Sequence, residues 1–307
     1  MSTGSFKKIG LMAKEGNKKA AETAKKIIPW LQRKKCEVLL PKEIFSTIGW
    51  EKTRFAGFGK LVPLASLSKE VDLILSLGGD GTFLKSVRLL HGRKCPVVGV
   101  KLGGVGFLTD ILPAEVEKGL ELIFNKKAVI EERVKLKAKI LRLEKGVEEG
   151  AKKEVASFEA LNDAVLHTSG IARISSYHIS IGADHFTTLN ADGVLVATPT
   201  GSTAYSFAAG GPVTHPEAKV LIVTPICPQN LANRPLIVAD ETKIAIELVS
   251  HNSEVLLTMD GQETYIMKEG DTVWISKSDH SAYFLGHSQK KYLESLRNKL
   301  FLEPDFS

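Results

Sequence analysis

The sequence is poor in cysteine and has no long apolar run. Its three cysteines, Cys36, Cys95 and Cys227, lie far apart and form no Cys-x-x-Cys pair. This spacing argues against a disulfide scaffold and a thiolate zinc site, and it fits a reducing compartment. No apolar stretch near the N-terminus could serve as a signal peptide. The longest uncharged run, 193–216, is rich in Thr, Ser, Gly and Pro and is no membrane span. We expect a soluble, cytoplasmic protein.

Several common functional motifs are also missing. The eight histidines show no His-Glu-x-x-His spacing, and neither a Gly-x-Ser-x-Gly elbow nor a Walker loop occurs. His167 lies in an apolar stretch, and we interpret it as packed rather than catalytic. The net charge is +6, but the basic residues are spread out and accompany no recognisable nucleic-acid module. We expect no nucleic-acid or membrane partner. The positive net charge suggests that the ligands are small anions.

The first part of the chain alternates between two kinds of apolar pattern. Its short apolar runs predict strands at 6–14, 36–40, 71–77 and 95–102. Apolar residues at helical spacing predict helices at 17–35, 82–91 and 113–125. The segment 41–70 has no clear period and reads as irregular. Strands that alternate with helices indicate a parallel sheet.

Near residue 128 the apolar period changes from 3.6 to 2. In 133–140 apolar and basic residues alternate strictly, as in an antiparallel strand with one face in water. Further strands are predicted at 155–166, 174–182, 193–198, 220–224, 243–249, 255–259 and 272–276. We therefore expect an α/β N-terminal domain with a parallel sheet over 1–126 and a mainly antiparallel β domain over 127–285. A C-terminal helix within 286–307 is expected to join the first domain.

A glycine-rich segment, GGDGT, joins the strand 71–77 to the following helix. Glycines permit positive φ and let backbone N–H groups approach a phosphate, so Gly78, Gly79 and Thr82 are candidates for a phosphate loop. The acid between the glycines, Asp80, would repel a phosphate. It is useful there if it binds a metal together with phosphates or accepts the proton of an attacking hydroxyl. The alternative is a helix-capping or turn residue.

A second segment, DGVLVATPTGSTAYSFAAGGP, covers 192–212. The pre-proline rule predicts a strand end at Thr198. A helix is expected to follow and to stop at the Gly-Gly-Pro of 210–212. The candidates for its cap are Thr200, Ser202 and Thr203. The alanines keep one side thin enough for a flat ligand, and Tyr205 offers a ring for stacking, which together suit a nucleotide.

These segments carry a resemblance to a known family. GGDGTFL, GGVGFL, LNDAV, DGVLVATPTGSTAYSFAAGGP, TPICPQNLANRPLIV and MDGQ occur in the order seen in NAD kinases. The resemblance covers most of the chain, from about 6 to 300. GGDG alone is shared with phosphofructokinases and with diacylglycerol and sphingosine kinases, whereas the long TPTGSTAYSFAAGGP run is not.

The resemblance implies transfer of a phosphoryl group from ATP, or in some members polyphosphate, to the 2′-hydroxyl of the adenosine ribose of NAD. The product would be NADP. A divalent ion such as Mg²⁺ and a homodimer or homotetramer are implied as well. Asp80 would match the general base, with Gly81 and Lys85 close to it. Asn162 and Asp163 would match the pair that holds the acceptor ribose. The remaining matches are Arg173, Asn190 and Asp192 near the dinucleotide, Thr203, Ala204, Tyr205, Ser206 and Ala208 in the walls of the nucleotide site, and Gln262 as an adenosine contact.

One position departs from the family pattern. Family members usually have Asn-Glu where this chain has Asn162-Asp163, and the shorter carboxylate falls short by roughly 1.5 Å, enough to alter acceptor affinity. Two other classes stay open from the residues alone: a lipid or sugar kinase with a GGDG loop, and a non-catalytic NAD(H)-binding module. The residues also leave open ATP or polyphosphate as donor, NAD or NADH as acceptor, dimer or tetramer, and inhibition by NADPH.

Overall fold

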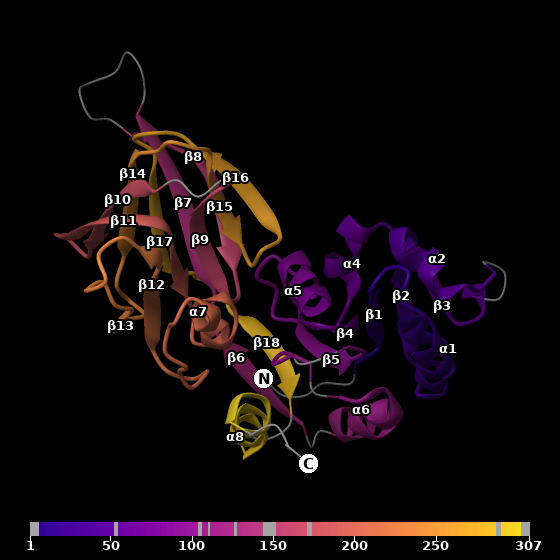
Figure 1. The fold of residues 1–307 in the computed structure, drawn as a ribbon. Coiled ribbons are helices and arrows are strands. Elements are labelled where there is room, and N and C mark those ends of the chain that lie inside the picture. The colour runs from indigo at the N-terminus through magenta and orange to yellow at the C-terminus, as the bar shows by residue number, and fades with distance from the viewer. Residues whose placement is uncertain are drawn as a thin grey trace. The chain divides into compact units, whose positions relative to one another are not determined.

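The structure is a computed structural model that describes residues 6–51, 55–103, 106–109, 111–125, 128–143, 152–170, 174–286 and 290–301. Contacts within the chain divide it into two compact units. The first unit contains Met1–Glu132 and Ala282–Ser307, and the second contains Arg133–Ser281. The chain therefore passes from one unit to the other twice, once on each side of the second unit (Figure 1).

The first unit is built on a seven-stranded sheet with the order β3-β2-β1-β4-β5-β18-β6. The strands are β1 (Lys8–Ala13), β2 (Glu37–Pro41), β3 (Gly59–Val62), β4 (Leu73–Gly78), β5 (Pro96–Lys101), β6 (Val129–Arg133) and β18 (Ala282–Gly286). From β3 through β18 neighbouring strands pair in parallel. Every residue of β4 is buried, which explains its continuous apolar run.

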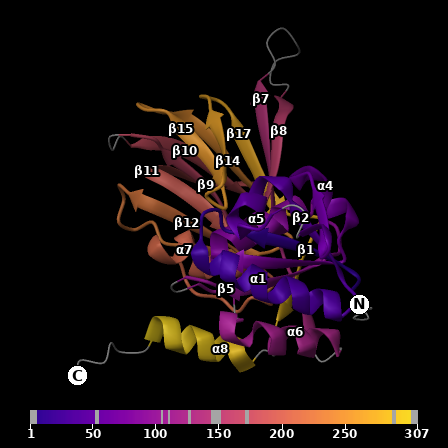
Figure 2. The ribbon, with the colours of Figure 1, turned by 90° about the vertical axis from the view of Figure 1, so that its right-hand side faces the viewer.

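Helices cover both faces of this sheet. They are α1 (Lys18–Arg33), α2 (Phe45–Ile48), α4 (Leu64–Glu70), α5 (Asp80–Leu89), α6 (Val116–Phe124) and α8 (Lys290–Leu296), with short turns η1 (Lys42–Ile44), η2 (Pro113–Glu115) and η4 (Arg297–Phe301). Helices α4 and α5 lie on one face, and α1 and α6 lie on the other (Figures 1 and 2). Asn17 caps α1 by accepting a 3.0 Å hydrogen bond from the N–H of Ala20. None of the described helices is long and apolar enough to span a bilayer.

The second unit is an eleven-stranded antiparallel sheet. Its main path runs β16-β15-β9-β11-β10-β14-β17-β7-β8, and β12 and β13 extend from β11. The strands are β7 (Leu136–Leu143), β8 (Lys152–Ala160), β9 (Asp163–Thr168), β10 (Ser175–Ile181), β11 (Asp184–Ala197), β12 (Val220–Pro228), β13 (Leu236–Ala239), β14 (Ile244–Ser250), β15 (Val255–Met259), β16 (Glu263–Met267) and β17 (Thr272–Lys277). Alternate residues of these strands form one apolar core that includes Leu136, Tyr177 and Val273. Two short turns, η3 (Thr200–Thr203) and α7 (Tyr205–Ala208), follow β11.

The predicted fold class, an α/β domain followed by a mainly antiparallel β domain, is confirmed. The prediction of an irregular segment at 41–70 is wrong, because η1, α2, β3 and α4 lie there. The predicted strand 155–166 is two strands, β8 and β9, separated by a turn. Strands β13, β16 and β18 were not predicted. Strand β18 and most of β6 lie in the first unit.

Candidate functional site

The glycine-rich junction lies at the carboxyl end of a central parallel strand, as expected. Strand β4 ends at Gly78 and α5 begins at Asp80, two residues earlier than predicted. Glycines permit positive φ, but no glycine of this junction adopts it. Gly78 is needed for space instead: a Cβ atom there would lie 2.3 Å from Oγ1 of Thr82. The compact turn therefore depends on a missing side chain rather than on a left-handed backbone.

Asp80 does not cap its own helix. Its carboxylate accepts hydrogen bonds from the backbone N–H groups of Phe107, at 2.8 Å, and Leu108, at 3.2 Å. A Cβ atom on Gly106 would lie 2.5 Å from Oδ1 of Asp80, so only glycine leaves room for this contact. A carboxylate has about four lone-pair positions. Two hydrogen bonds therefore fix the direction of the side chain and leave acceptor capacity for another proton donor.

The turn that holds Asp80 has a second support within the first unit. The ammonium group of Lys299, in η4, donates a hydrogen bond to the carbonyl of Gly106. The same ammonium group lies 4.6 Å from the centre of the Phe107 ring. Sequence analysis missed Lys299, because no local pattern connects it to a turn so far away in the chain. Lys85, one helical turn after Gly81, is half-buried on α5.

In the second unit, a cavity of about 370 Å³ lies over β9 and the turns beside it. Four residues predicted as site residues line it: Asn162, Asp163, Ala204 and Tyr205. The other lining residues are Val165, His167, Thr258, Asp260 and Gly261. Segments that are distant in sequence thus meet around one cavity, and most of the side chains that line it can form hydrogen bonds.

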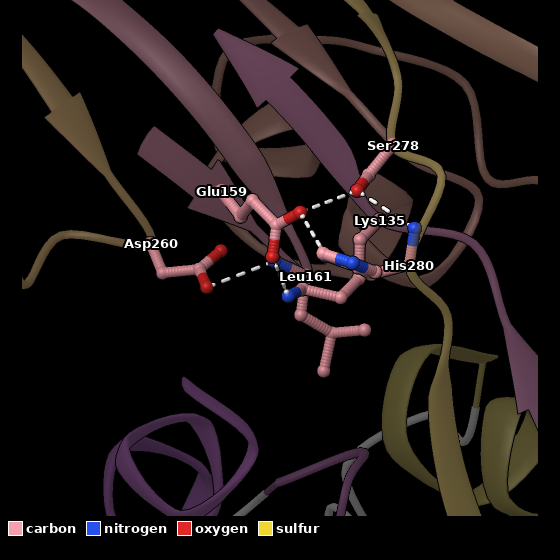
Figure 3. Close-up of polar contacts among 6 residues, drawn as sticks. All are labelled: Lys135, Glu159, Leu161, Asp260, Ser278 and His280. Atoms are coloured by element: carbon pink, nitrogen blue, oxygen red, sulfur yellow. Dashed lines mark hydrogen bonds and ion pairs between the residues drawn. The ribbon is translucent and has the colours of Figure 1, made fainter. Parts of the chain in front are cut away.

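Asp260 organises the floor of this cavity. Its carboxylate accepts hydrogen bonds from the N–H groups of Leu161 (2.9 Å), Asn162 (2.7 Å) and Asp163 (3.3 Å) (Figure 3 shows the first of these). Asp260 and Gly261 have φ of 53° and 62°, as a type I′ turn between β15 and β16 requires. The Asp-Gly turn of this hairpin therefore also fixes the turn between β8 and β9.

The Leu161-Asn162 turn and the segment after β11 are joined directly by hydrogen bonds. Thr198 donates a 2.6 Å hydrogen bond from its hydroxyl to the carbonyl of Leu161, and its N–H donates to the carbonyl of Asn162 at 2.8 Å. A Cβ atom on Gly201 would lie 2.1 Å from that same Asn162 carbonyl, so the segments approach as closely as glycine allows. The hydroxyl of Thr198 also accepts from the N–H of Gly201 at 3.1 Å.

These contacts correct the prediction for the segment after β11. Thr198, rather than any of the three predicted candidates, caps the turn that follows. The expected helix is only the short turns η3 and α7, since Ala204 between them has φ of −97° and ψ of −131°. Ala204, at this interruption, and Tyr205 after it line the cavity.

The carboxyl group of Asp163 has an unusually high pKa. Only 4% of its surface is exposed, and this burial raises its pKa to about 7, with the carboxylate of Asp260 adding to the rise. A hydrogen bond from the backbone N–H of Tyr205 offsets part of the effect. The Asp163 carboxyl group therefore titrates near neutral pH, which is common at functional sites.

The remaining predicted residues lie elsewhere. Ser206 is fully buried and its hydroxyl pairs with that of Thr224 at 3.3 Å, which makes it part of the packing. Thr203, Ala208, Asp192 and Gln262 do not line the cavity over β9. Asn190 lines a different cavity of about 270 Å³ with Thr187, Thr188, Gln229, Asn230 and Asn233. Arg173 lies outside the described residues.

Two cavity residues were missed, although signals for them existed. Asp260 and Gly261 form an Asp-Gly pair between two apolar stretches, which is a strong hairpin signal. That signal predicts the turn but not the bonds that the Asp260 side chain makes. His167 was interpreted as packed; it is half-buried and lines the cavity, with Nδ1 3.1 Å from the carbonyl of Thr168.

Comparisons with known proteins agree with this geometry. The ATP-NAD kinase N-terminal domain matches residues 9–128, and the ATP-NAD kinase C-terminal domain matches residues 161–286. An NAD kinase of Syntrophotalea carbinolica is 39% identical over 96% of this chain and 98% of its own length. An NAD kinase of Magnetococcus marinus is 36% identical over 95% of this chain and 92% of its own length.

Solved structures show the same fold. Yeast NADH kinase, solved in complex with NADH, has a TM-score of 0.87 and 25% identity, covering 99% of this chain and 90% of its own. An NAD kinase from Archaeoglobus fulgidus, solved with ATP, has a TM-score of 0.72 and 24% identity over 94% of this chain and 98% of its own. These matches set aside the lipid kinase, sugar kinase and non-catalytic alternatives. The chain is a phosphotransferase and belongs to the NAD kinase family.

Proposed function

We propose that this enzyme transfers the terminal phosphoryl group of ATP to the 2′-hydroxyl of the adenosine ribose of NAD. In this proposal the cavity over β9 binds the acceptor, and Asp80 accepts the proton of the attacking hydroxyl. Inorganic polyphosphate as donor and NADH as acceptor are the alternatives that the assay below distinguishes.

One observation carries the assignment of the acceptor site. The Oδ1 atom of Asn162 is buried at the cavity and has no hydrogen-bond donor among the described residues. A buried acceptor without a donor is costly, so a ligand that brings one is favoured. The nearby Asp163 carboxylate can accept from hydroxyl groups, and Tyr205, 47% exposed, offers a ring for stacking. Adenosine supplies hydroxyls, an amino group and a flat base.

The chemistry assigned to Asp80 follows from its surroundings. A ribose hydroxyl is a weak nucleophile at neutral pH, and a carboxylate placed to accept its proton helps the transfer. The two backbone hydrogen bonds to Asp80 hold the carboxylate in one direction before substrate arrives. Phosphoryl transfer depends mainly on positioning and charge. The Asp80 carboxylate, held in a fixed direction beside a glycine-rich turn, can both position the attacking hydroxyl and accept its proton.

The family implies a divalent cation, and the residues fit Mg²⁺ bound mainly through substrate. Across the ranges that the structure describes, no group of three or more His, Cys, Asp or Glu side chains could hold a metal. Mg²⁺ is typically bound by one or two carboxylates together with substrate phosphates, rather than by a protein cage. Substrate phosphates would be its main ligands, and the ion would neutralise phosphate charge when bound.

Homo-oligomeric assembly and a cytoplasmic location complete the proposal. The cysteines suit a reducing compartment, since three free thiols are present and two of them, Cys36 and Cys95, are buried. The described helices include none able to cross a membrane. Size-exclusion chromatography with light scattering would give the number of subunits, because a dimer and a tetramer differ twofold in mass.

The proposed activity is tested by incubating the purified protein with NAD, ATP and Mg²⁺ and coupling NADP to an NADP-specific dehydrogenase. We expect NADP to form with ATP and NAD. Repeating the assay with polyphosphate, and with NADH as acceptor after oxidation of the product, assigns the donor and the acceptor. If NADP and NADPH form under none of these conditions, the proposed function is wrong.

A further inference from the structure

A partly buried polar cluster lies in the second unit, outside the cavity over β9, with Lys135 and Ser278 buried and His280 exposed. It consists of Lys135, Glu159, Ser278 and His280, and we call it the Glu159 cluster (Figure 3). Oε2 of Glu159 lies 2.5 Å from the ammonium of Lys135. Oε1 of Glu159 accepts from the hydroxyl of Ser278 at 2.5 Å and lies 2.9 Å from Nδ1 of His280.

The burial of this cluster shows that it is not an ordinary surface ion pair. The side chain of Lys135 is only 4% exposed, and that of Glu159 is 23% exposed. Burial raises the pKa of the Glu159 carboxyl, but the hydrogen bonds from Lys135, Ser278 and His280 outweigh it, so the pKa lies below its usual value. A buried ammonium group is tolerated only when it is paired. The carboxylate of Glu159 therefore holds its three partners firmly.

The partners of Glu159 come from both connections between the two units. The first connection runs from Glu132 to Arg133, and Lys135 follows it by two residues. The second runs from Ser281 to Ala282, and His280 and Ser278 precede it. Ser278 also donates its N–H to the carbonyl of Lys135 at 2.8 Å. The Glu159 carboxylate thus links residues near both ends of the second unit to strand β8.

Strand β8 leads directly from Glu159 to the acceptor pair. Ala160 is its last residue, and the turn Leu161-Asn162 follows before β9 begins at Asp163. Asp260 holds this turn from one side, while the Glu159 cluster holds the strand before it (Figure 3). Only two residues, Ala160 and Leu161, separate Glu159 from Asn162, so a shift of β8 at Glu159 displaces Asn162 and Asp163 within the cavity.

We propose that Glu159 is a positioning residue for the acceptor, which sets Asn162 and Asp163 by anchoring β8 to both connecting segments. This inference rests on the proposed function of the cavity. Glu159 touches no reacting atom in this proposal. It acts through Asp163, and its substitution should change acceptor binding rather than donor binding.

The test begins with Glu159→Ala. We expect the Michaelis constant for NAD to rise about tenfold, as for lost hydrogen bonds to a charged group, while that for ATP changes little. In an Asp163→Ala background the same substitution should add almost nothing, because residues that act as a unit are not additive. The double variant Lys135→Gln/Glu159→Gln keeps a hydrogen-bonded pair without charge and should restore most of the affinity for NAD.

Arg142→Gln is the matched control. Arg142, near the end of β7, forms a bidentate pair with the fully buried Asp271, with both distances 2.7 Å. It lies roughly 20 Å along the strand from Lys135. This variant should lower the melting temperature as Glu159→Ala does but leave the Michaelis constant for NAD unchanged. If Glu159→Ala does not fold, Ser278→Ala and His280→Ala are tested instead, because both variants leave the ion pair of Lys135 and Glu159 intact.

The outcomes separate this inference from the proposed function. If wild-type protein forms no NADP, the proposed function fails, and calorimetric binding of NAD to the same variants then tests Glu159. If wild-type protein is active, the inference is overturned by an unchanged constant for NAD in the Glu159 variants. It is also overturned by an equal rise in Arg142→Gln, or by full additivity with Asp163→Ala.

Discussion

The carboxylate of Asp80 accepts a 2.8 Å hydrogen bond from the backbone N–H of Phe107, 27 residues further along the chain. Together with the bond from Leu108, this contact holds the aspartate of the glycine-rich junction in place. An aspartate that served only to cap its helix would bond to its own first turn. Asp80 instead joins two loops of the first unit, and its direction depends on the turn at Gly106.

Gly106→Ala should therefore reduce turnover while the protein stays folded. The new Cβ atom would lie 2.5 Å from Oδ1 of Asp80 and would push the carboxylate aside. Misplacement of a catalytic group by about 1 Å can cost on the order of 100-fold in rate, and we expect at least a tenfold loss. The measurement is the turnover number in the coupled NADP assay at saturating substrates.

Gly103→Ala is the matched control for this variant. A Cβ atom on Gly103 would have no described heavy atom within 4 Å. Its turnover should stay close to that of the wild type. If Gly106→Ala and Gly103→Ala behave alike, the position of Asp80 does not limit the rate.

Asp163→Ala should raise the Michaelis constant for NAD much more than that for ATP. Losing hydrogen bonds to a charged group costs roughly 1.5–3 kcal/mol, which corresponds to about ten- to a hundredfold in affinity. Steady-state kinetics with each substrate varied in turn would measure both constants. Equal effects on the two substrates would mean that Asp163 is structural. Ser206→Ala is the control, since its hydroxyl pairs with Thr224 in the packing and its loss should leave the NAD constant unchanged.

The raised pKa of Asp163 predicts a dependence of stability on pH. Because the folded chain binds this proton up to about pH 7, against about 3.9 for an ordinary Asp, the group contributes stability that is full below about pH 4. That contribution is lost as the pH rises towards 7. The melting temperature of wild-type protein should therefore fall relative to that of Asp163→Asn over this range. Parallel curves for the two proteins would contradict the raised pKa.

The same equilibrium predicts that NAD binds better at higher pH. An ionised carboxylate can accept from two hydroxyls, whereas a protonated one offers fewer acceptor positions. Calorimetric titration should show the affinity of wild-type protein for NAD rising between about pH 6 and pH 8, on either side of the Asp163 pKa. The affinity of Asp163→Asn should stay flat over that interval. A rise of equal size in the variant would assign the effect to another group.

The pattern of apolar residues and glycines was sufficient to predict those elements whose structure depends on residues close together in sequence. The unbroken apolar run of β4 indicated a buried parallel strand, and the glycines after it indicated the junction that ends at Asp80. The change of period near residue 128 likewise predicted the antiparallel sheet of the second unit. Both inferences depend on residues close together in sequence, which is where hydrophobic periodicity is informative.

Contacts between distant residues could not be predicted in this way. Nothing near Asp80 indicates that its carboxylate bonds to Phe107, and nothing near Asp260 indicates that it holds Leu161, 99 residues away. Strand β18 was missed because its five residues pair with β5 only after the chain has passed through the whole second unit. The contact between the hydroxyl groups of Ser206 and Thr224 could not be predicted either, because the two residues are distant in sequence.

The central claim is that Asp80 accepts the proton of the acceptor hydroxyl, and Asp80→Asn tests it most directly. This variant keeps the shape of the side chain and removes both the base and the charge. General-base catalysis typically contributes about 10²–10⁴-fold, and we predict that turnover at saturating Mg²⁺ falls at least about a hundredfold. NAD should still bind within about tenfold of wild type, since the loss is one of chemistry and not of uniform binding. A fall in turnover of less than about tenfold would show that Asp80 is not the base. Loss of NAD binding together with turnover would show that its hydrogen bonds to Phe107 and Leu108 hold the loop and that the residue is structural.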